Sequence, residues 1–404
     1  MTPFDLIVEK KACYELPGFQ PLSVDAAFLQ ARGIDYPLDD AVHTALIAGS
    51  DLFATLFANR ALIPEKGYTE ALANVEQELE VHNYTGICPT NVMEVTPSSG
   101  SCAVACQYCL VTDGSHCKPI TVYTNYSDKL RPSLERNRGR QLFYYFSPKT
   151  EAFSEPHLYN GIAHDVLRTF IDHYRQFPDS SIRIFIASKA GPAHLSVKHQ
   201  GESLFDLMAQ IPTKIQYNGS IGIMPGYLRD VLEPNAASIE ERLEVLVRCR
   251  ESGIWAESVL CQPLILPYLT EENVHTYCRQ LQQAGVKNIK PEFLTTEVRN
   301  LVLFAQFINY YNPELLGEFF YPYLHAHNLG HIKQRSRLAP DKTVCVEKLD
   351  MMRRIADEYG ITISICNWVK RELGQAAEWV LSVDTASSSN GYRCLGYQTR
   401  LFTQ

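Results

Sequence analysis

Short apolar runs rich in β-branched and aromatic residues alternate, over residues 91–294, with longer segments whose apolar positions recur at helical spacing. Strands that alternate with helices in this way predict an α/β fold with a parallel sheet. Such a sheet curls into a whole or partial barrel, and six units fit a partial (β/α)6 barrel of the TIM type better than the full eight. The six predicted strands are NVMEVTP (91–97), QLFYYF (141–146), SIRIFIAS (181–188), KIQYNGSIGI (214–223), WAESVLCQP (255–263) and VKNIKPEF (286–293).

Capping signals locate the helices between these strands. Ser238 and Glu241 form a capping box, and Gly253 is placed to end the helix that they begin. Thr270 is the N-cap of a second helix that ends at Gly285. Both helices therefore have a predicted start and a predicted end.

A third helix is predicted to begin at Ser154 and Pro156 and to continue to about residue 174. Its apolar positions fall on or near one face, as expected for a helix that covers a sheet. These positions are Leu158, Ile162, Val166, Phe170 and Tyr174.

The alternation stops on both sides of the predicted barrel. Residues 1–90 are expected to form a mainly helical extension with a short β start. Residues 295–404 are expected to form an α+β extension that covers the mouth of the barrel. The second extension contains predicted helices near 297–311 and 345–359, the predicted strand ITISIC (361–366) and an irregular tail.

Composition and charge narrow the possible functions. The chain has 404 residues, of which 46% are hydrophobic, so it can bury a large core. No apolar run approaches the roughly 20 residues of a membrane span, and the first residues lack the apolar centre of a signal peptide, so we expect a cytoplasmic protein without membrane contact. Twelve cysteines in that compartment argue for reduced thiols and metal binding rather than disulfides. The net charge of −8 argues against a broad nucleic-acid surface.

Two basic runs are local exceptions to this acidic composition. They are KLRPSLERNRGR (129–140) and HIKQRSR (331–337). For each run the sequence leaves two readings open, a solvated surface or a contact with phosphate or carboxylate groups.

Three cysteines directly follow the first predicted strand. Cys102, Cys106 and Cys109 have the spacing C-x3-C-x2-C, and the small residues 98–101 before them allow the backbone to wrap closely around a bound group. Ligands of parallel α/β folds gather at the loops after the carboxyl ends of strands. Three thiolates complete neither a tetrahedral zinc site nor the four irons of a cubane cluster, so one metal position stays open to another ligand.

Other metal arrangements remain open from the residues alone. A zinc site could use His116 or Cys117 as its fourth ligand, and Cys117 could instead be a hydrogen donor or an inert thiol. Two further groups carry weaker signals for a second metal site. They are the histidines His325, His327 and His331, and the scattered cysteines Cys345, Cys366 and Cys394.

The cysteine motif after the first strand of a predicted partial barrel resembles the radical S-adenosylmethionine (SAM) superfamily. This resemblance implies a [4Fe–4S] cluster on Cys102, Cys106 and Cys109, with SAM bound at the fourth iron. It also implies an external electron donor, such as flavodoxin or ferredoxin. One electron would cleave SAM to methionine and a 5′-deoxyadenosyl radical, which takes a hydrogen from the substrate. The aromatic residue before the third cysteine, Tyr108, would lie beside the adenine.

Within that superfamily, residues 96–270 are similar to the spore photoproduct lyase-like branch. The similar segments are VYTNYSDKL (122–130), IFIASKAG (184–191), the pattern Glu233, Pro234, Arg242 and Gly253, and CQPLILPYLT (261–270). One departure separates the chain from spore photoproduct lyase itself. Phe146 stands where that enzyme has the cysteine that returns a hydrogen to its product.

The resemblance also implies roles for residues at the ends of the later strands. Lys189 would hold the SAM carboxylate, and Ser220 would contact the ribose or the carboxylate. The residues' own alternatives are a surface lysine and a structural strand serine. In the loop after the second strand, one of Ser147, Lys149 and Glu151 would contact the methionine amino group. Glu233 and Arg242, by contrast, are expected to pair with each other or to cap a helix.

Three classes of function follow from these features. The leading one is a radical SAM enzyme that abstracts hydrogen from a small molecule or a peptide in a biosynthetic pathway. The alternative is an enzyme that repairs or modifies nucleic acid, with the two basic runs on the phosphate backbone. The third is a metal-binding or redox module without catalytic activity.

Overall fold

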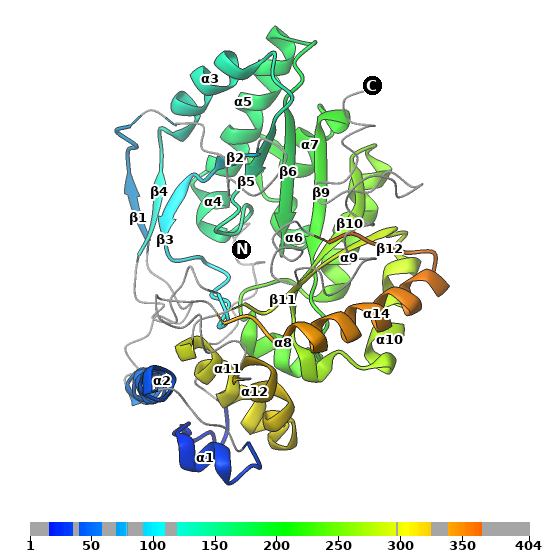
Figure 1. Ribbon diagram of the computed structural model, residues 1–404. Helices are drawn as coiled ribbons and strands as arrows, with labels where there is room; N and C mark the ends of the chain where they lie inside the picture. The colour runs from blue at the N-terminus through cyan, green and yellow to red at the C-terminus, as the bar shows by residue number, and fades with distance from the viewer. Residues whose placement is uncertain are drawn as a thin grey trace.

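A computed structural model of the chain describes residues 16–34, 40–58, 70–77, 79, 92–109, 119–295, 298–324 and 338–365. In this part of the chain the largest sheet has seven strands in the order β12-β11-β10-β9-β6-β5-β2, and every neighbouring pair is parallel (Figure 1). The strands are β2 (Val92–Val95), β5 (Phe143–Phe146), β6 (Arg183–Ser188), β9 (Ile215–Ser220), β10 (Trp255–Leu264), β11 (Asn288–Phe293) and β12 (Thr362–Ile363).

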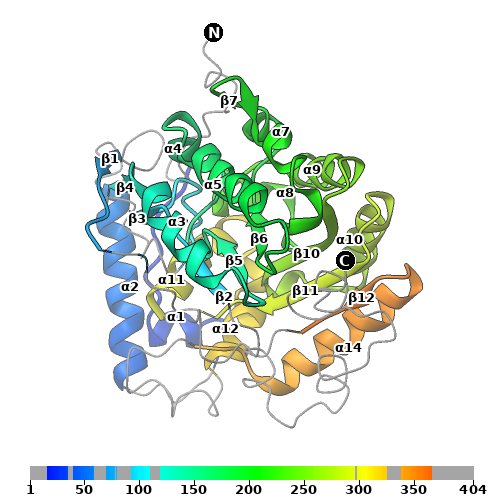
Figure 2. The same ribbon diagram turned by 90° about the horizontal axis from the view of Figure 1, so that it is seen from above.

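The strands follow one another across the sheet in chain order, so each connection leads to the neighbouring strand on the same side. Right-handed crossovers of this kind place their helices on one face of the sheet. Figure 2 shows these helices as an arc outside the strands. The long ones are α3 (Tyr126–Asn137), α5 (Ile162–Gln176), α9 (Ile239–Glu251), α10 (Glu271–Gln283) and α14 (Lys342–Glu358), and the shorter connecting elements are α4 (Glu155–Tyr159), α6 (Pro192–Leu195), β7 (Lys198–His199), β8 (Glu202–Ser203), α7 (Leu204–Met208) and α8 (Gly226–Leu232).

The predicted α/β class with a parallel sheet is confirmed, and all six predicted strands lie in the sheet. The sheet has one strand more than predicted, because the strand predicted at 361–366 in the C-terminal extension joins it. Part of that run forms β12, where Thr362 and Ile363 pair with Asn288 and Ile289 of β11. The description of the sheet as a partial barrel stays a prediction.

Two predicted helices begin as expected, and the third was wrong in its extent. The side chains of Ser238 and Thr270 cap α9 and α10, and Ser238 forms the predicted box with Glu241. The predicted helix from Ser154 is instead two helices, α4 and α5. It breaks at Gly161, whose φ of +73° is left-handed and whose missing side chain leaves room for the His199 ring.

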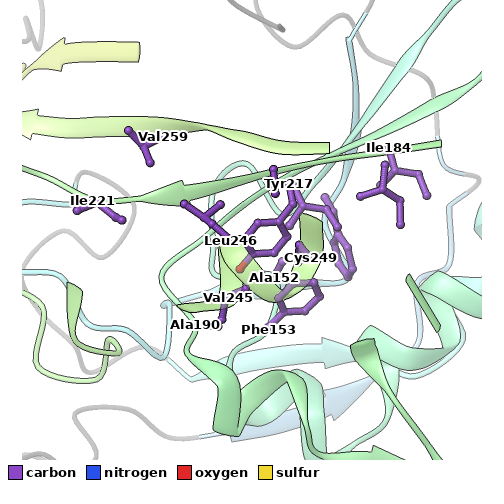
Figure 3. Packing of buried hydrophobic residues seen from close by; sticks show 14 of the residues in the cluster. Ala152, Phe153, Ile184, Ala190, Tyr217, Ile221, Val245, Leu246, Cys249 and Val259 are labelled. Atoms are coloured by element: carbon purple, nitrogen blue, oxygen red, sulfur yellow. The ribbon is translucent and has the colours of Figure 1, made fainter. Parts of the chain in front are cut away.

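The helix-covered face of the sheet is apolar because alternate strand residues point to it. On β9 these residues are Ile215 and Tyr217. The next residue, Asn218, points to the opposite face of the sheet. Phe153 stacks on Tyr217 with ring centroids 6.4 Å apart. Figure 3 shows both rings beside Leu246 of α9, which closes the core from the helix side. The predicted apolar face of the 154–174 segment is confirmed, since its five positions are all in this core.

A second apolar cluster lies at the carboxyl ends of the strands. It includes Leu228 after β9, Ile265 after β10 and Leu294 after β11, together with Phe53 and Phe307 from helices that precede and follow the sheet in sequence. Figure 1 shows these helices gathered below the sheet. They are α1 (Ala26–Gln30), α2 (Asp40–Ala58), α11 (Val298–Tyr311) and α12 (Leu316–Leu324).

The predicted extensions, residues 1–90 and 295–404, thus both contribute helices to one cluster. The domain boundaries at 91 and 294 stay a prediction. Among the described helices, none is both long enough and apolar enough to cross a lipid bilayer.

Candidate functional site

A cavity of about 430 Å³ opens at the carboxyl ends of β5, β6, β9, β10 and β11. Its wall contains all seven residues that the sequence predicted for the cluster and for SAM. They are Cys102, Cys106, Cys109, Tyr108, Ser147, Lys189 and Ser220. Residues up to 118 positions apart in the chain are therefore brought into one site by the parallel strands, whose carboxyl ends share one edge.

The cysteine segment leaves the main sheet through a short hairpin that the sequence did not predict. After β2 the chain forms β3 (Ser98–Gly100), which pairs antiparallel with β4 (Ile120–Tyr123), and β1 (Glu70–Ala73) adds to β4 in parallel. The expectation that residues 98–101 wrap around a ligand is therefore corrected for the first three, which form a strand. Gly100 ends this strand with a φ of +86°.

Replacing Gly100 by Ala is expected to lower the free energy of unfolding by about 1 to 3 kcal/mol. The reason is that φ is left-handed there, and a Cβ would overlap the carbonyl oxygen of Pro119. The matched control is Gly226→Ala at the start of α8, where an added Cβ meets nothing within 4 Å. Urea unfolding of both variants checks the prediction, and equal stabilities would contradict it.

The end of α8 and the segment that follows it hold the cysteine loop in place. Leu232 accepts a hydrogen bond from the Gln107 amide at 2.9 Å, and the Asn235 side chain donates to the Ala103 carbonyl at 2.8 Å. Within the loop, the Cys109 amide donates to the Cys106 carbonyl at 3.1 Å. The loop conformation thus depends on a segment more than 120 residues later in the chain.

Glu233, in that same segment, is the centre of a buried charge network. Its Oε2 accepts from Arg242 Nη2 at 2.6 Å, and its Oε1 accepts from Lys189 Nζ at 2.9 Å and from the Tyr108 hydroxyl. The side chains of Glu233 and Arg242 are each 1% exposed. Burial opposes the charge on Glu233, but Arg242 and Lys189 outweigh it and hold the pKa at about 2, below the ordinary value of 4.5. The predicted pairing of Glu233 with Arg242 is confirmed.

Lys189 directly follows β6 and is not a surface residue. Its ammonium donates to Glu233 and also to Ser220 Oγ, at 2.9 Å in both cases, and its side chain is 13% exposed. Lys189 and Ser220 therefore lie next to each other on the cavity wall. Tyr108 contacts the same group, with Lys189 Nζ 5.9 Å from its ring centroid, and packs against Phe304 of α11.

Ser147, Lys149 and Glu151 lie in the loop after β5, and their contacts differ. Glu151 is buried and accepts from the hydroxyl of Ser188 at 2.6 Å and from the Lys189 amide at 2.8 Å, so it holds the loop against the end of β6. Burial raises its pKa above the ordinary value. Lys149 instead pairs with Glu94 at 3.0 Å.

Two hydroxyl groups of that loop are available to a ligand. Ser147 has a left-handed φ of +52°, and its Oγ is buried with no hydrogen-bond partner in the described part of the chain. The same holds for Thr150 Oγ1, and both residues line the cavity. Buried hydroxyl groups in this condition are rare in proteins unless a ligand or water completes them. Sequence reasoning missed Thr150, because nothing in its spacing distinguishes it from Ser147.

The three thiols are close enough to influence one another. Burial, and then the neighbouring Cys109, raise the pKa of Cys102 to about 12, and burial raises that of Cys106 well above 9. Within the described residues, no three histidine, cysteine or acidic side chains are grouped as ligands of a single metal ion. A [4Fe–4S] cluster makes a different demand, because each cysteine binds a different iron and the thiolates stand farther apart. Three thiols on one cavity wall fit that group better than a single ion.

His157 anchors the hairpin that leads into the cysteine loop. Its ring nitrogens contact Ser98 Oγ at 2.9 Å and the Ala152 carbonyl at 3.1 Å, and the residue is 0% exposed. Burial lowers its pKa from 6.5 to about 4. As the pH falls, His157 is therefore protonated near pH 6.5 in the unfolded chain but only near pH 4 in the folded protein.

We expect this histidine to make the protein less stable as pH falls from 6.5 toward 4. Its contribution is fully present above pH 6.5, and about 2 to 3 kcal/mol of it disappears by pH 4.5. The variant His157→Gln should lack that part of the pH dependence. Urea unfolding at pH 7.5 and pH 4.5 measures it, and an identical difference in wild type and variant would contradict the assignment.

Several sequence predictions lie outside the described residues. These are His116, Cys117, the histidines of 325–331, the basic run 331–337, Cys366 and Cys394. Cys345 is buried in α14. The first basic run forms much of α3, where Arg131 pairs with Asp172 at 3.8 Å and Lys129 donates to the Glu76 carbonyl. Its contact with nucleic acid stays untested.

Comparison with known proteins gives limited information. No protein-family model and no curated protein matches the chain. Among the similar solved structures is the radical S-adenosylmethionine methyltransferase TsrM from Kitasatospora setae, with tryptophan substrate and a SAM analog bound. The TM-score is 0.43 at 13% identity, over 77% of this chain and 66% of that chain, just under two thirds of its length. A likeness this weak carries no functional argument, and the spore photoproduct lyase-like branch finds no support in these comparisons.

Proposed function

We propose that the protein is a radical SAM enzyme that binds a [4Fe–4S] cluster on Cys102, Cys106 and Cys109. The observation that carries the proposal is the meeting of three thiols and the four predicted SAM-binding residues on the wall of one cavity. Each of these residues is also predicted from the sequence pattern alone. A metal-binding module without catalysis would have no need of the four predicted SAM-binding residues.

The contacts support a division of roles around SAM. The ammonium of Lys189 has three N–H groups, so it can keep Glu233 and Ser220 and still donate to a ligand carboxylate. The hydroxyls of Ser147 and Thr150 are suited to accept from an amino group. Tyr108, whose hydroxyl donates to Glu233, would lie beside the adenine. Reduced and bound, the cluster would supply the electron that cleaves SAM, and the substrate is proposed to be a small molecule or a peptide.

The test is anaerobic reconstitution of the full chain with iron and sulfide. With dithionite and SAM the reconstituted protein should form methionine and 5′-deoxyadenosine in equal amounts, and omission of dithionite should prevent both. Absence of both products from protein that has taken up iron and sulfide would overturn the proposal. Zinc in place of iron in protein purified without oxygen would favour the metal-binding module.

A further inference from the structure

Two of the residues proposed to bind SAM are held by the same oxygen atom. Oε1 of Glu233 accepts from Lys189 Nζ at 2.9 Å and also from the Tyr108 hydroxyl. Lys189 follows β6, whereas Tyr108 belongs to the cysteine loop, so the two donors come from distant parts of the chain. Both line the cavity, and Glu233 lies behind its wall. The carboxylate therefore fixes the spacing between two groups that face a ligand.

The other oxygen of Glu233 is bound by Arg242, which reaches a third residue of the proposed SAM site. Arg242 Nη2 donates to Glu233 Oε2 at 2.6 Å. The same guanidinium donates from Nη1 to the Ser220 carbonyl and from Nε to the Ala237 carbonyl, at 2.8 Å in both cases. Arg242 thus ties the carboxylate to the end of β9, where Ser220 joins the cavity wall.

The backbone around Glu233 contacts both sides of the site as well. The Leu232 carbonyl accepts from the Gln107 amide in the cysteine loop at 2.9 Å. On the other side, the Ala237 amide donates to the Lys189 carbonyl at 3.0 Å. Residues 232–237 therefore bridge the cysteine loop and the end of β6, so the side-chain bonds of Glu233 start from a backbone that is itself fixed.

A carboxylate suits position 233 because three donors meet there. Its two oxygens accept from all three, whereas a glutamine side chain has one acceptor oxygen and an amino group that only donates. With glutamine in place of Glu233, the oxygen would stay with Arg242, since a guanidinium that is 1% exposed is costly to leave without an acceptor. Lys189 and Tyr108 would then face an amino group and lose their shared acceptor.

We propose that Glu233 is a positioning residue, which sets the spacing of Lys189 and Tyr108 so that one SAM molecule is bound at both of its ends. SAM carries its carboxylate and its adenine at opposite ends, and groups that are already held in place bind such a ligand with a smaller loss of entropy. The inference rests on the proposed function for the identity of the ligand. It adds the reason why the site selects the whole molecule over its parts.

The test measures ligand binding to the reconstituted full chain by calorimetry without oxygen. The probe is S-adenosylhomocysteine, which keeps both ends of SAM but has no sulfonium to cleave. Its binding should weaken about tenfold or more in Glu233→Gln, equivalent to about 1.4 kcal/mol. Binding of adenosine, which uses only the Tyr108 end, should weaken less than about threefold. A general loss of structure would instead weaken both probes equally.

A second variant approaches the same link from the cysteine loop. Tyr108→Phe keeps the ring and removes the hydroxyl that donates to Glu233, so it should also weaken binding of S-adenosylhomocysteine. Added to Glu233→Gln it should have little further effect, because the link is already broken. Circular dichroism checks the fold of each variant, and Tyr108→Phe alone decides the matter if Glu233→Gln does not fold.

The matched control is Glu94→Gln, which removes the charge from the partner of Lys149, the other lysine of the cavity wall. Its affinity for S-adenosylhomocysteine should stay within about twofold of wild type. Unchanged affinity in folded Glu233→Gln would overturn the inference, as would equal losses for both probes or full additivity of the two substitutions. Wild-type protein that takes up the cluster but does not bind S-adenosylhomocysteine would overturn the proposed function as well, so the two failures are distinguishable.

Discussion

The variant Cys106→Ala is expected to lose SAM cleavage by more than about a thousandfold after anaerobic reconstitution. Cys106 is the most buried of the three cysteines in the motif, at 7% exposed, and its loop is fixed by Leu232 and Asn235. Apart from Cys102 and Cys109, no thiol of the described chain lines the cavity, so no fourth one can replace Cys106 there. The measurements are iron and sulfide content, the visible absorbance of the cluster, and the yield of 5′-deoxyadenosine.

The control for this variant is Cys278→Ala. Cys278 is also buried but lies on α10 in the apolar core, away from the cavity, so its loss should leave cluster content and cleavage unchanged. Circular dichroism of both variants before reconstitution separates a lost ligand from a lost fold. Undiminished cleavage by folded Cys106→Ala would contradict the assignment of the motif.

Replacing Glu233 by Ala is expected to lower the free energy of unfolding by about 3 to 5 kcal/mol at neutral pH. The substitution leaves Arg242, which is 1% exposed, and Lys189 without their shared carboxylate. One fully buried and one largely buried cation would then lack their counter-ion, which is costly, whereas the wild-type network is complete. Denaturant unfolding of the protein without cluster measures the effect independently of activity.

An exposed ion pair provides the comparison for Glu233. Glu257→Ala removes the partner of Lys287, whose side chain is 58% exposed, and should lower the free energy of unfolding by less than about 1 kcal/mol.

The contribution of Glu233 to the free energy of unfolding also depends on pH, with a definite sign. Because the folded pKa of Glu233 is about 2, its contribution is complete above pH 4.5 and is lost as pH falls toward 2. A Glu233→Ala protein as stable as Glu257→Ala would show that the network does not stabilise the fold.

The sequence by itself determined the parallel α/β sheet and predicted seven of the residues that line the cavity. Alternating apolar runs and capping residues such as Ser238 are local signals, so they predicted the strands and helices without any tertiary contact. Strand ends also predicted the place of Lys189 and Ser220, because parallel strands bring their carboxyl ends to one edge. For Glu233 and Arg242 the sequence left two readings open, a mutual pair or a helix cap, and the structure shows the pair.

Only the tertiary structure decided which polar groups are already bound and which face the cavity. Ser147 and Glu151 belong to one short loop, yet the Ser147 hydroxyl is buried without a partner in the described chain while Glu151 is bound to β6. The partners of Glu233 and the pairing of Gln262 with Glu292 likewise join distant segments. Such contacts depend on the register and packing of strands, which residue spacing along the chain does not encode. For the same reason the strand predicted at 361–366 was placed in the main sheet, as β12, only by its pairing with β11.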